Sequence, residues 1–231
     1  MDSKLSAVVL AAGTGSRMNL DVTKQRIEIA NESVLSRAVA AFQNCTDVSE
    51  IIVVVRSEEL EYAKNLLSQF CKVKDIVVGG SVRSESAKIG FEVISDLQGY
   101  VAIHDAARCL VTPDMISSVF RDAIKYGAAT ASTIVSDTVK MVDSDGFITK
   151  TISRKDLRLM QTPQIFRKSD YKKALASLNE GDEGITDDNM LLERIGVRVF
   201  CTETGKKNMK ITLKEDIEYA RFLLEGEHAD V

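Results

Sequence analysis

The sequence contains few of the residues from which proteins build metal sites. It has two histidines and four cysteines, and no C-x-x-C pair occurs among the cysteines. The cysteines, Cys45, Cys71, Cys109 and Cys201, lie far apart along the chain. Structural zinc sites need closely spaced pairs of ligands. A zinc site is therefore not expected, and four unpaired thiols in a reducing compartment are.

The sequence also lacks an excess of positive charge. Thirty Lys and Arg residues stand against 34 Asp and Glu, which gives a formal net charge of -4. The protein as a whole therefore does not attract polyanions, and a phosphate ligand must be held by a local basic cluster. No Lys/Arg stripe with interleaved aromatic residues occurs, so we expect no nucleic-acid partner.

Long hydrophobic runs are absent as well. The first apolar run, residues 7–12, is too short for a membrane span or for the apolar part of a signal peptide, and a glycine turn follows it. We therefore expect a cytoplasmic protein with no membrane partner.

What the sequence does contain is a series of short apolar runs, most of them rich in Val and Ile. They do not alternate strictly with polar residues, which is typical of strands buried on both faces. The runs occur at residues 7–12, 51–55, 75–78, 100–104, 129–135 and 197–200. Helical patterns separate most of them. The sequence thus predicts one Rossmann-like α/β domain over residues 1–231, with a mostly parallel twisted sheet flanked by helices.

Two of the helices have recognisable ends. Thr112 is expected to cap a helix that has Pro113 at its first position and Gly127 at its end. Thr212 and Glu215 have the spacing of a capping box before the last helix.

Residues 137–160 depart from the alternation of strands and helices. Two strands are expected, at 138–142 and 147–152, joined by the turn DSDG. A hairpin that protrudes from a parallel sheet has edges that need covering. This β-arm either pairs with the arm of a second subunit, making a homodimer, or folds back on its own domain.

The turn AAGTGSRM at 11–18 follows the first predicted strand. A dinucleotide fold is disfavoured because Met18 stands where a third glycine is needed and the next strand ends in Arg56 rather than in an acidic residue. A Walker loop would close with G-K-[ST], which is absent. Two interpretations remain from the residues alone. The turn either cradles a triphosphate with Arg17 and Lys24 supplying positive charge, or is a glycine-rich turn with two solvated basic side chains.

A set of motifs along the whole chain resembles one family in order and spacing. The motifs are AAGTGSRM at 11–18, KQ at 24–25, GG with Arg83 at 79–83, HDAAR at 104–108, TPQ at 162–164, ITDD at 185–188 and NMKIT at 208–212. The chain is similar to the 2-C-methyl-D-erythritol 4-phosphate cytidylyltransferases, CTP-using enzymes of the non-mevalonate isoprenoid pathway. The resemblance implies transfer of a cytidylyl group from CTP to methylerythritol phosphate, giving 4-diphosphocytidyl-2-C-methylerythritol and pyrophosphate.

The resemblance also implies roles for individual residues. Arg17 and Lys24 match the pair that stabilises the transition state, and Arg154 and Lys210 match the pair that grips the incoming phosphate. The nucleotide is expected to contact Ala11, Ala12, Gly13, Gly15, Gly80, Arg83, Ser86, Asp105 and Ala106. The polyol phosphate is expected to contact Asp105, Arg108, Thr138, Arg154, Thr162, Thr186 and Lys210, with Thr138 and Arg154 delivered by the arm to the neighbouring subunit. Asp105 is also expected to help hold Mg²⁺ or another divalent cation.

Several of these positions have an ordinary structural interpretation beside the functional one. Arg83 fits a solvated residue at a helix start, Arg108 fits a surface charge, and Lys210 fits a solvated lysine on a short strand. Asp105 fits a loop aspartate whose side chain caps nearby backbone, and Thr186 fits the N-cap of the helix that follows it. His104 ends a buried strand and is expected to be a core residue rather than a ligand.

Three positions depart from the family's usual pattern. Thr23 and Cys109 stand where proline is usual, and Ser153 replaces an acidic residue beside Arg154. Ribitol-5-phosphate cytidylyltransferase, a sister enzyme with the same loops, is the nearest alternative, although Ala107 favours the methylerythritol enzyme. A non-catalytic nucleotide-binding regulatory module on the same scaffold would be expected to lack Arg17, Lys24 or Lys210, and all three are present.

Overall fold

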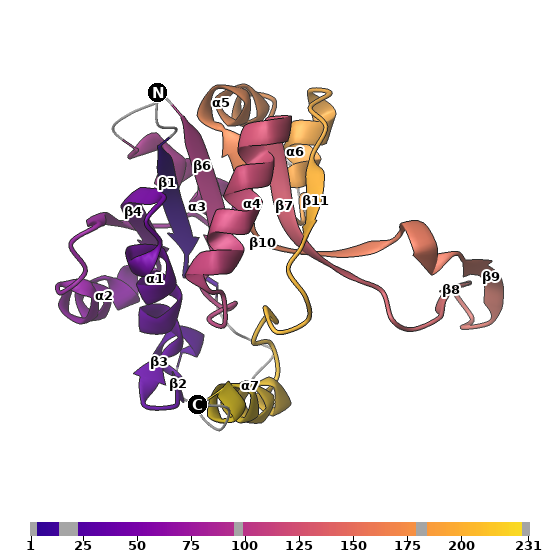
Figure 1. Cartoon of the computed structure of the whole chain (residues 1–231), viewed down its shortest axis with the longest axis horizontal. Helices are drawn as coiled ribbons and strands as arrows, with labels where there is room; N and C mark the ends of the chain where they lie inside the picture. Colours follow the sequence, from indigo (N-terminus) through magenta and orange to yellow (C-terminus); the bar gives the residue numbers. More distant parts are fainter. Residues whose placement is uncertain (1–3, 14–22, 95–98, 179–183, 228–231) are drawn as a thin grey trace.

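The computed structural model describes residues 4–13, 23–94, 99–178 and 184–227. Its centre is a seven-stranded sheet in the order β11-β7-β10-β6-β1-β4-β5 (Figure 1). The strands are β1 Leu5–Leu10, β4 Val48–Val55, β5 Val73–Val78, β6 Tyr100–Asp105, β7 Ala128–Ile134, β10 Arg158–Arg167 and β11 Phe200–Glu203. The paired strands are parallel except where β10 pairs with β6 and β7. The prediction of a mostly parallel α/β sheet is confirmed.

Helices cover both faces of this sheet. The helices are α1 Val34–Asn44, α2 Leu60–Leu67, α3 Arg83–Glu92, α4 Pro113–Tyr126, α5 Lys168–Ala176, α6 Asn189–Arg194 and α7 Lys214–Glu227. α7 lies beyond the end of the sheet (Figure 1). Short 3-10 turns form at η2 Lys24–Arg26, η3 Ser57–Glu59 and η4 Arg154–Asp156. Two further short strands, β2 Glu28–Ile29 and β3 Glu32–Ser33, pair antiparallel with each other. None of the helices in the described part of the chain has the length and apolar character needed to cross a membrane.

The apolar runs of the central strands form strands because both faces of the sheet are buried there, whereas the edge strand β5 is half-buried to exposed. Along β1, Leu5, Ala7 and Val9 join a core cluster with α1, α2 and α4. Val8 and Leu10, which point the other way, join a second cluster with α3, α5 and α6. The run predicted at 197–200 is the exception, because β11 begins only at Phe200 and continues to Glu203.

One of the two predicted helix ends is correct and the other is wrong. Thr112 caps α4 by accepting a hydrogen bond from the Met115 N–H, and Gly127 follows the helix with a φ of 94°. At α7, by contrast, the Asp216 carboxylate accepts from the Thr212 N–H, the Thr212 hydroxyl and the Leu213 N–H. Asp216 is one residue beyond the predicted Glu215 and reaches back to the chain before the helix, which begins only at Lys214.

Between β7 and β10 the chain leaves the sheet as a long hairpin (Figure 1). Its two strands, β8 Val139–Val142 and β9 Ile148–Ile152, pair antiparallel with each other and lie apart from the main sheet. Apolar side chains near its tip are exposed, among them Val142, Phe147 and Ile148 at 58%, 72% and 64%. Such a cluster on a protruding element is typical of a surface that is covered by another chain.

Candidate active site

A cavity of about 350 Å³ opens at the carboxyl ends of β1 and β6, where ligands bind in open α/β sheets. Leu10 ends β1 and Asp105 ends β6, while the first turn of α3 closes the opposite wall. Many of the predicted site residues line it: Ala12, Gly13, Lys24, Gly80, Arg83, Ser86, Asp105 and Lys210. The remaining lining residues are Leu10, Gln25, Ser81, Val82 and Ala107.

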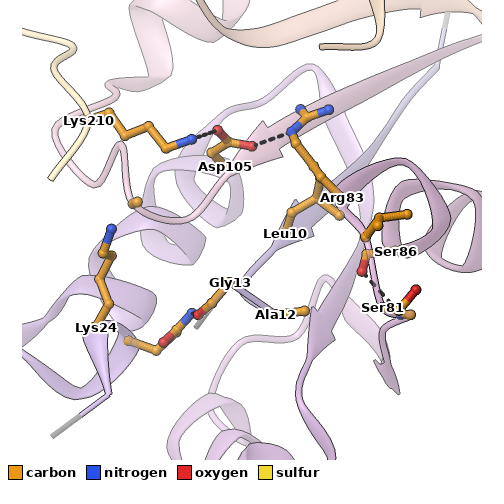
Figure 2. A pocket seen from close by; sticks show the side chains of 13 residues that line it. Leu10, Ala12, Gly13, Lys24, Ser81, Arg83, Ser86, Asp105 and Lys210 are labelled. Atoms are coloured by element: carbon orange, nitrogen blue, oxygen red, sulfur yellow. Dashed lines mark hydrogen bonds and ion pairs between the residues drawn. The ribbon is translucent and has the colours of Figure 1, made fainter. Parts of the chain in front are cut away.

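A row of ion-paired side chains with alternating charges lies along one side of this cavity. The Lys210 ammonium donates to Asp105 Oδ2 at 2.6 Å, and Arg83 Nε donates to Asp105 Oδ1 at 3.1 Å (Figure 2). Arg83 Nη1 in turn donates to Asp188 Oδ2 at 2.6 Å. These residues come from four separate parts of the sequence, so only the fold brings them together.

The ion pairs fix the protonation states of these groups. Burial alone raises the pKa of the Asp105 carboxyl, but the charges of Arg83 and Lys210 outweigh burial and hold this pKa well below its usual range. Burial alone lowers the pKa of Arg83, but Asp188 and Asp105 outweigh it and raise the pKa of this guanidinium above its usual value. Asp105 is therefore a carboxylate and Arg83 a cation at any physiological pH.

The glycine pair before α3 shapes the opposite wall. Gly80 N–H donates to Ser86 Oγ at 3.1 Å, and Glu85 accepts from the Ser81 N–H at 2.7 Å. A Cβ at Gly79 would lie 2.7 Å from Ser86 Oγ and 2.9 Å from Ala12 Cβ, closer than such atoms approach in real proteins. Gly79 is therefore required for the close approach of the β5–α3 turn to the end of β1, although the sequence argument assigned it no role.

Gln25 lies in the KQ motif and lines the cavity, a role that its position in the sequence does not predict. Its side-chain amide donates to the Ala11 carbonyl and, at 3.3 Å, to the Gly13 carbonyl. Ala11 itself is buried and does not line the cavity. Gln25 thus holds the segment that follows β1 in place. The neighbouring Lys24 faces the cavity (Figure 2). The predicted Gly15 and Arg17 lie outside the described residues.

Two other predicted residues support the cavity from beneath. Thr162 is buried, and its hydroxyl accepts from the Asp105 N–H at 3.0 Å and contacts His104 Nδ1 at 3.1 Å. Arg108 donates to the carbonyls of Asn208 at 2.9 Å and Met160 at 3.2 Å. Ala106 is also buried and, like Thr162 and Arg108, does not line the cavity. In this structure Thr162 and Arg108 hold the segments that carry Asp105 and Lys210.

Three further predicted residues lie outside the cavity lining. Thr138 and Arg154 flank the strands of the hairpin, and the Arg154 side chain donates to the Ser136 carbonyl. Thr186 contacts Met190 Sδ at 3.4 Å through its hydroxyl. The predicted N-cap role of Thr186 is wrong, because α6 starts at Asn189 and Asp187 accepts from the Met190 N–H at 3.2 Å instead.

The departures from the family pattern leave the backbone and the core intact. Thr23 has a φ of -68°, which is the value that proline would impose, so the turn before Lys24 keeps its shape without the ring. Cys109 is buried, and burial raises the pKa of its thiol to about 11. It is one of four free cysteines, as expected. Ser153 precedes η4 with a φ of -63° and makes no capping bond through its side chain.

His104 is fully buried at the end of β6, as the sequence predicts, and its stability contribution depends on pH. Burial lowers the pKa of His104 from 6.5 to about 3. The folded state thus keeps the imidazole neutral in a range where the unfolded chain protonates it. Between those two values the unfolded state binds more protons, so the free energy of unfolding falls as pH falls, by up to about 1.4 kcal/mol per pH unit from this residue.

His104→Gln is expected to remove this part of the pH dependence. Urea unfolding of both proteins between pH 7.5 and about pH 4.5 measures it, and the gap between their unfolding free energies should change with pH in that window. Parallel curves for the two proteins would show that His104 titrates normally in the folded state.

The fit of the cavity to a divalent cation rests on Asp105. Mg²⁺ prefers oxygen ligands and takes one or two carboxylates together with substrate phosphates. Asp105 supplies one such carboxylate in the cavity lining. No group of three or more His, Cys, Asp or Glu that could hold a metal occurs within the described ranges. The donor set therefore fits an ion that arrives with a phosphate ligand rather than one held by the protein alone.

Comparison with known proteins identifies the family. The family model described as 2-C-methyl-D-erythritol 4-phosphate cytidylyltransferase matches residues 5–226. A protein of that name from Lachnospira eligens is 37% identical over 226 residues, covering 96% of this chain and 99% of the relative. One from Caldanaerobacter subterraneus is 42% identical over 224 residues, covering 95% and 98%.

Solved structures agree with this assignment. The 4-diphosphocytidyl-2C-methyl-D-erythritol synthase of Anaerococcus prevotii superposes with a TM-score of 0.86 at 27% identity, covering 97% of this chain and all of that one. The 2-C-methyl-D-erythritol 4-phosphate cytidylyltransferase of Francisella tularensis gives a TM-score of 0.80 at 28% identity, covering 95% and 99%. The chain therefore belongs to the 2-C-methyl-D-erythritol 4-phosphate cytidylyltransferase family.

Proposed function

We propose that this chain transfers the cytidylyl group of CTP to 2-C-methyl-D-erythritol 4-phosphate, releasing pyrophosphate. The observation that carries the proposal is the cavity at the carboxyl ends of β1 and β6, which Lys24, Arg83 and Lys210 line with positive charge. Two anionic substrates repel each other, and an enzyme that joins them needs cations on several sides. The family membership supplies the identity of the two substrates.

The chemistry asks little of the protein beyond position and charge. The attacking group is a phosphate oxygen that is already anionic, so no general base or protein nucleophile is needed. Attack on the α-phosphorus of CTP builds negative charge there and on the leaving pyrophosphate. Lys24 and Arg17 are assigned to the stabilisation of that charge, and Lys210 to the incoming phosphate. Charge-assisted hydrogen bonds that strengthen in the transition state raise the rate directly.

The nucleotide is assigned to the wall made by the β1 and β5 turns. Ala12, Gly13, Gly80 and Ser86 line that wall, and the backbone N–H of a glycine-rich turn is a suitable donor to phosphate or to a pyrimidine edge. Arg83, already tied to Asp105, is assigned to the sugar or base at the same wall. Asp105 and Ala106 complete the nucleotide side.

Mg²⁺ is proposed as the cofactor, with Asp105 as the protein residue that would help hold it. When bound, the ion neutralises phosphate charge. Asp105 is ionised for this role, since Arg83 and Lys210 hold its pKa low.

The hairpin is proposed to complete the site of a second subunit in a homodimer. Support comes from its exposed apolar tip and from Arg154, which lies in η4, in the arm rather than at the cavity of its own chain. Thr138 and Arg154 would then contact the polyol phosphate of the partner, beside Thr162, Thr186, Arg108 and Lys210. We further propose that the protein works in the cytoplasm, where its four free thiols would stay reduced.

Pyrophosphate release measured with CTP, Mg²⁺ and either methylerythritol phosphate or ribitol phosphate tests the proposal. Rapid release with methylerythritol phosphate, and little with ribitol phosphate or with ATP in place of CTP, is expected. Faster turnover of ribitol phosphate would move the chain to the sister activity. No release with either acceptor would leave the regulatory module as the better account.

A further inference from the structure

Asp188 is a buried carboxylate that the proposed mechanism does not use. It is 1% exposed, and its two oxygens have different partners. Oδ2 accepts from Arg83 Nη1 at 2.6 Å, and Oδ1 accepts from the Tyr171 hydroxyl at 2.6 Å. Its backbone N–H donates to Gln164 Oε1 at 2.9 Å. A carboxylate satisfied on every side by short bonds occupies one fixed position.

Tyr171 provides the rigid end of this arrangement. Its ring is fully buried in α5, at 5.1 Å from the Phe91 ring and 5.4 Å from the Phe166 ring. Burial, followed by the neighbouring Asp188 charge, raises the pKa of Tyr171 well above its usual value. The hydroxyl therefore stays protonated and remains a donor to Asp188.

Arg83 lies between two carboxylates because of this arrangement. It begins α3 and reaches across the cavity wall, bonding Asp105 through Nε and Asp188 through Nη1. Two acceptors on a planar guanidinium fix its plane as well as its position. The third nitrogen, Nη2, is buried and has no acceptor within the described residues, so the bonds of the guanidinium go to the two carboxylates.

We infer that Asp188 is a positioning residue of the cytidylyl transfer, acting through Arg83. With Asp188 neutral, Arg83 keeps Asp105 as its one acidic partner and shifts toward it, because nothing of opposite charge holds its other edge. Asp105 then binds Arg83 more closely and Lys210 less closely, since both cations share its two oxygens. One buried carboxylate thus sets the geometry on the nucleotide side and, through Asp105, on the side of the incoming phosphate. This inference rests on the proposed function for the identity of the substrates.

Asp188→Asn keeps the shape of the side chain and removes its charge. We expect kcat/KM for CTP to fall about 100-fold, the size of loss that misplacing a binding group produces, with most of it in KM for CTP. Asp122→Asn is the matched control. Asp122 also accepts a short bond from a hydroxyl, at 2.7 Å from Thr202, but it does not pair with Arg83, whose acidic partners are Asp105 and Asp188. Its kinetics should stay within about twofold of the wild type.

A double variant separates positioning from a purely structural role. If Asp188 acts through Arg83, Arg83→Met and Arg83→Met with Asp188→Asn should have the same kcat/KM. The double variant should also melt at a higher temperature than Arg83→Met, which leaves Asp188 buried without its cation. A further tenfold loss of kcat/KM in the double variant would overturn the inference, and so would Asp188→Asn kinetics within about threefold of the wild type.

Tyr171→Phe keeps the test decisive if Asp188→Asn does not fold. It removes one donor to Asp188 and leaves the charge, and kcat/KM for CTP should fall about fivefold, the worth of one hydrogen bond. Unchanged kinetics would then refute the inference. Calorimetric affinity for CTP with Mg²⁺ separates this result from the proposed function. If the wild type releases no pyrophosphate the proposed function fails, whereas equal CTP affinity of wild type and Asp188→Asn refutes the role of Asp188.

Discussion

Lys24→Ala is expected to lower kcat for cytidylyl transfer about a thousandfold while CTP still binds, because removing one preorganised donor from a developing charge costs this much in other enzymes. Lys24 lines the cavity from the 3-10 turn η2, and Gln25 beside it is bonded to the chain leaving β1. Its ammonium is assigned to charge that appears only as the α-phosphate is attacked. Ground-state binding of CTP therefore depends on it much less than turnover does.

Two measurements test this prediction: the single-turnover rate at saturating CTP and the equilibrium affinity for CTP. Lys64→Ala is the matched control, since Lys64 lies on the surface of α2 in an exposed pair with Glu61 at 3.3 Å. Its kcat should equal that of the wild type. Loss of CTP binding in Lys24→Ala together with normal turnover at saturation would show a binding role instead of a transition-state role.

Mixing Lys24→Ala subunits with Arg154→Ala subunits is expected to restore about a quarter of the wild-type activity, although each variant alone is nearly inactive. Random pairing makes half of the dimers mixed. In each mixed dimer, one of the two sites combines an intact Lys24 with an intact Arg154 from the other chain. The expectation follows from the position of Arg154 in η4, after β9 of the arm and outside the cavity lining of its own chain.

The mixture must be equilibrated long enough for subunits to exchange, and the time course of recovery reports that exchange. Arg158→Ala mixed with Lys24→Ala serves as the control. The Arg158 guanidinium donates to the carbonyls of Lys155 and Leu157 and has no assigned role in the site. The activity of that mixture should come from two sources only. These are the Arg158→Ala homodimers and, in each mixed dimer, the one site that retains Lys24. No recovery in the Lys24 and Arg154 mixture after full exchange would mean that each chain completes its own site.

Much of the fold could be predicted because local pattern and global burial agree. The run at 51–55 is apolar at every position and forms the last five residues of β4, buried on both faces. Boundaries were harder where the chain lies at an edge. β11 is an edge strand that pairs with β7, and Phe200, Cys201 and Glu203 in it are exposed, so apolar residues do not mark its start.

Site residues could be predicted where a motif lies at the end of a strand. They could not be predicted where packing alone decides which side chains bond to each other. Asp105 and Lys210 are 105 positions apart, and the sequence motifs name both without showing that they bond. Asp188 lies in the ITDD motif, but nothing local in the sequence distinguishes a carboxylate that bonds Arg83 from one that caps a helix. The capping error at Thr212 has the same origin, since Glu215 and Asp216 differ by one position and only the path of the preceding chain selects between them.

The alternating charges of Lys210, Asp105, Arg83 and Asp188 have a consequence for selectivity among anions. Each of the two cations already has a carboxylate as counter-ion, so an anionic ligand that binds either cation must compete with that carboxylate. A simple anion such as sulfate offers one charge centre and must compete with Asp105 for Lys210. A ligand with several linked phosphates bonds to several donors at once, so it competes with the same carboxylates through a larger number of bonds. Because of the resident carboxylates, an anion binds at Lys210 only when further contacts hold it as well, as Arg154 of the arm is proposed to do for the incoming phosphate.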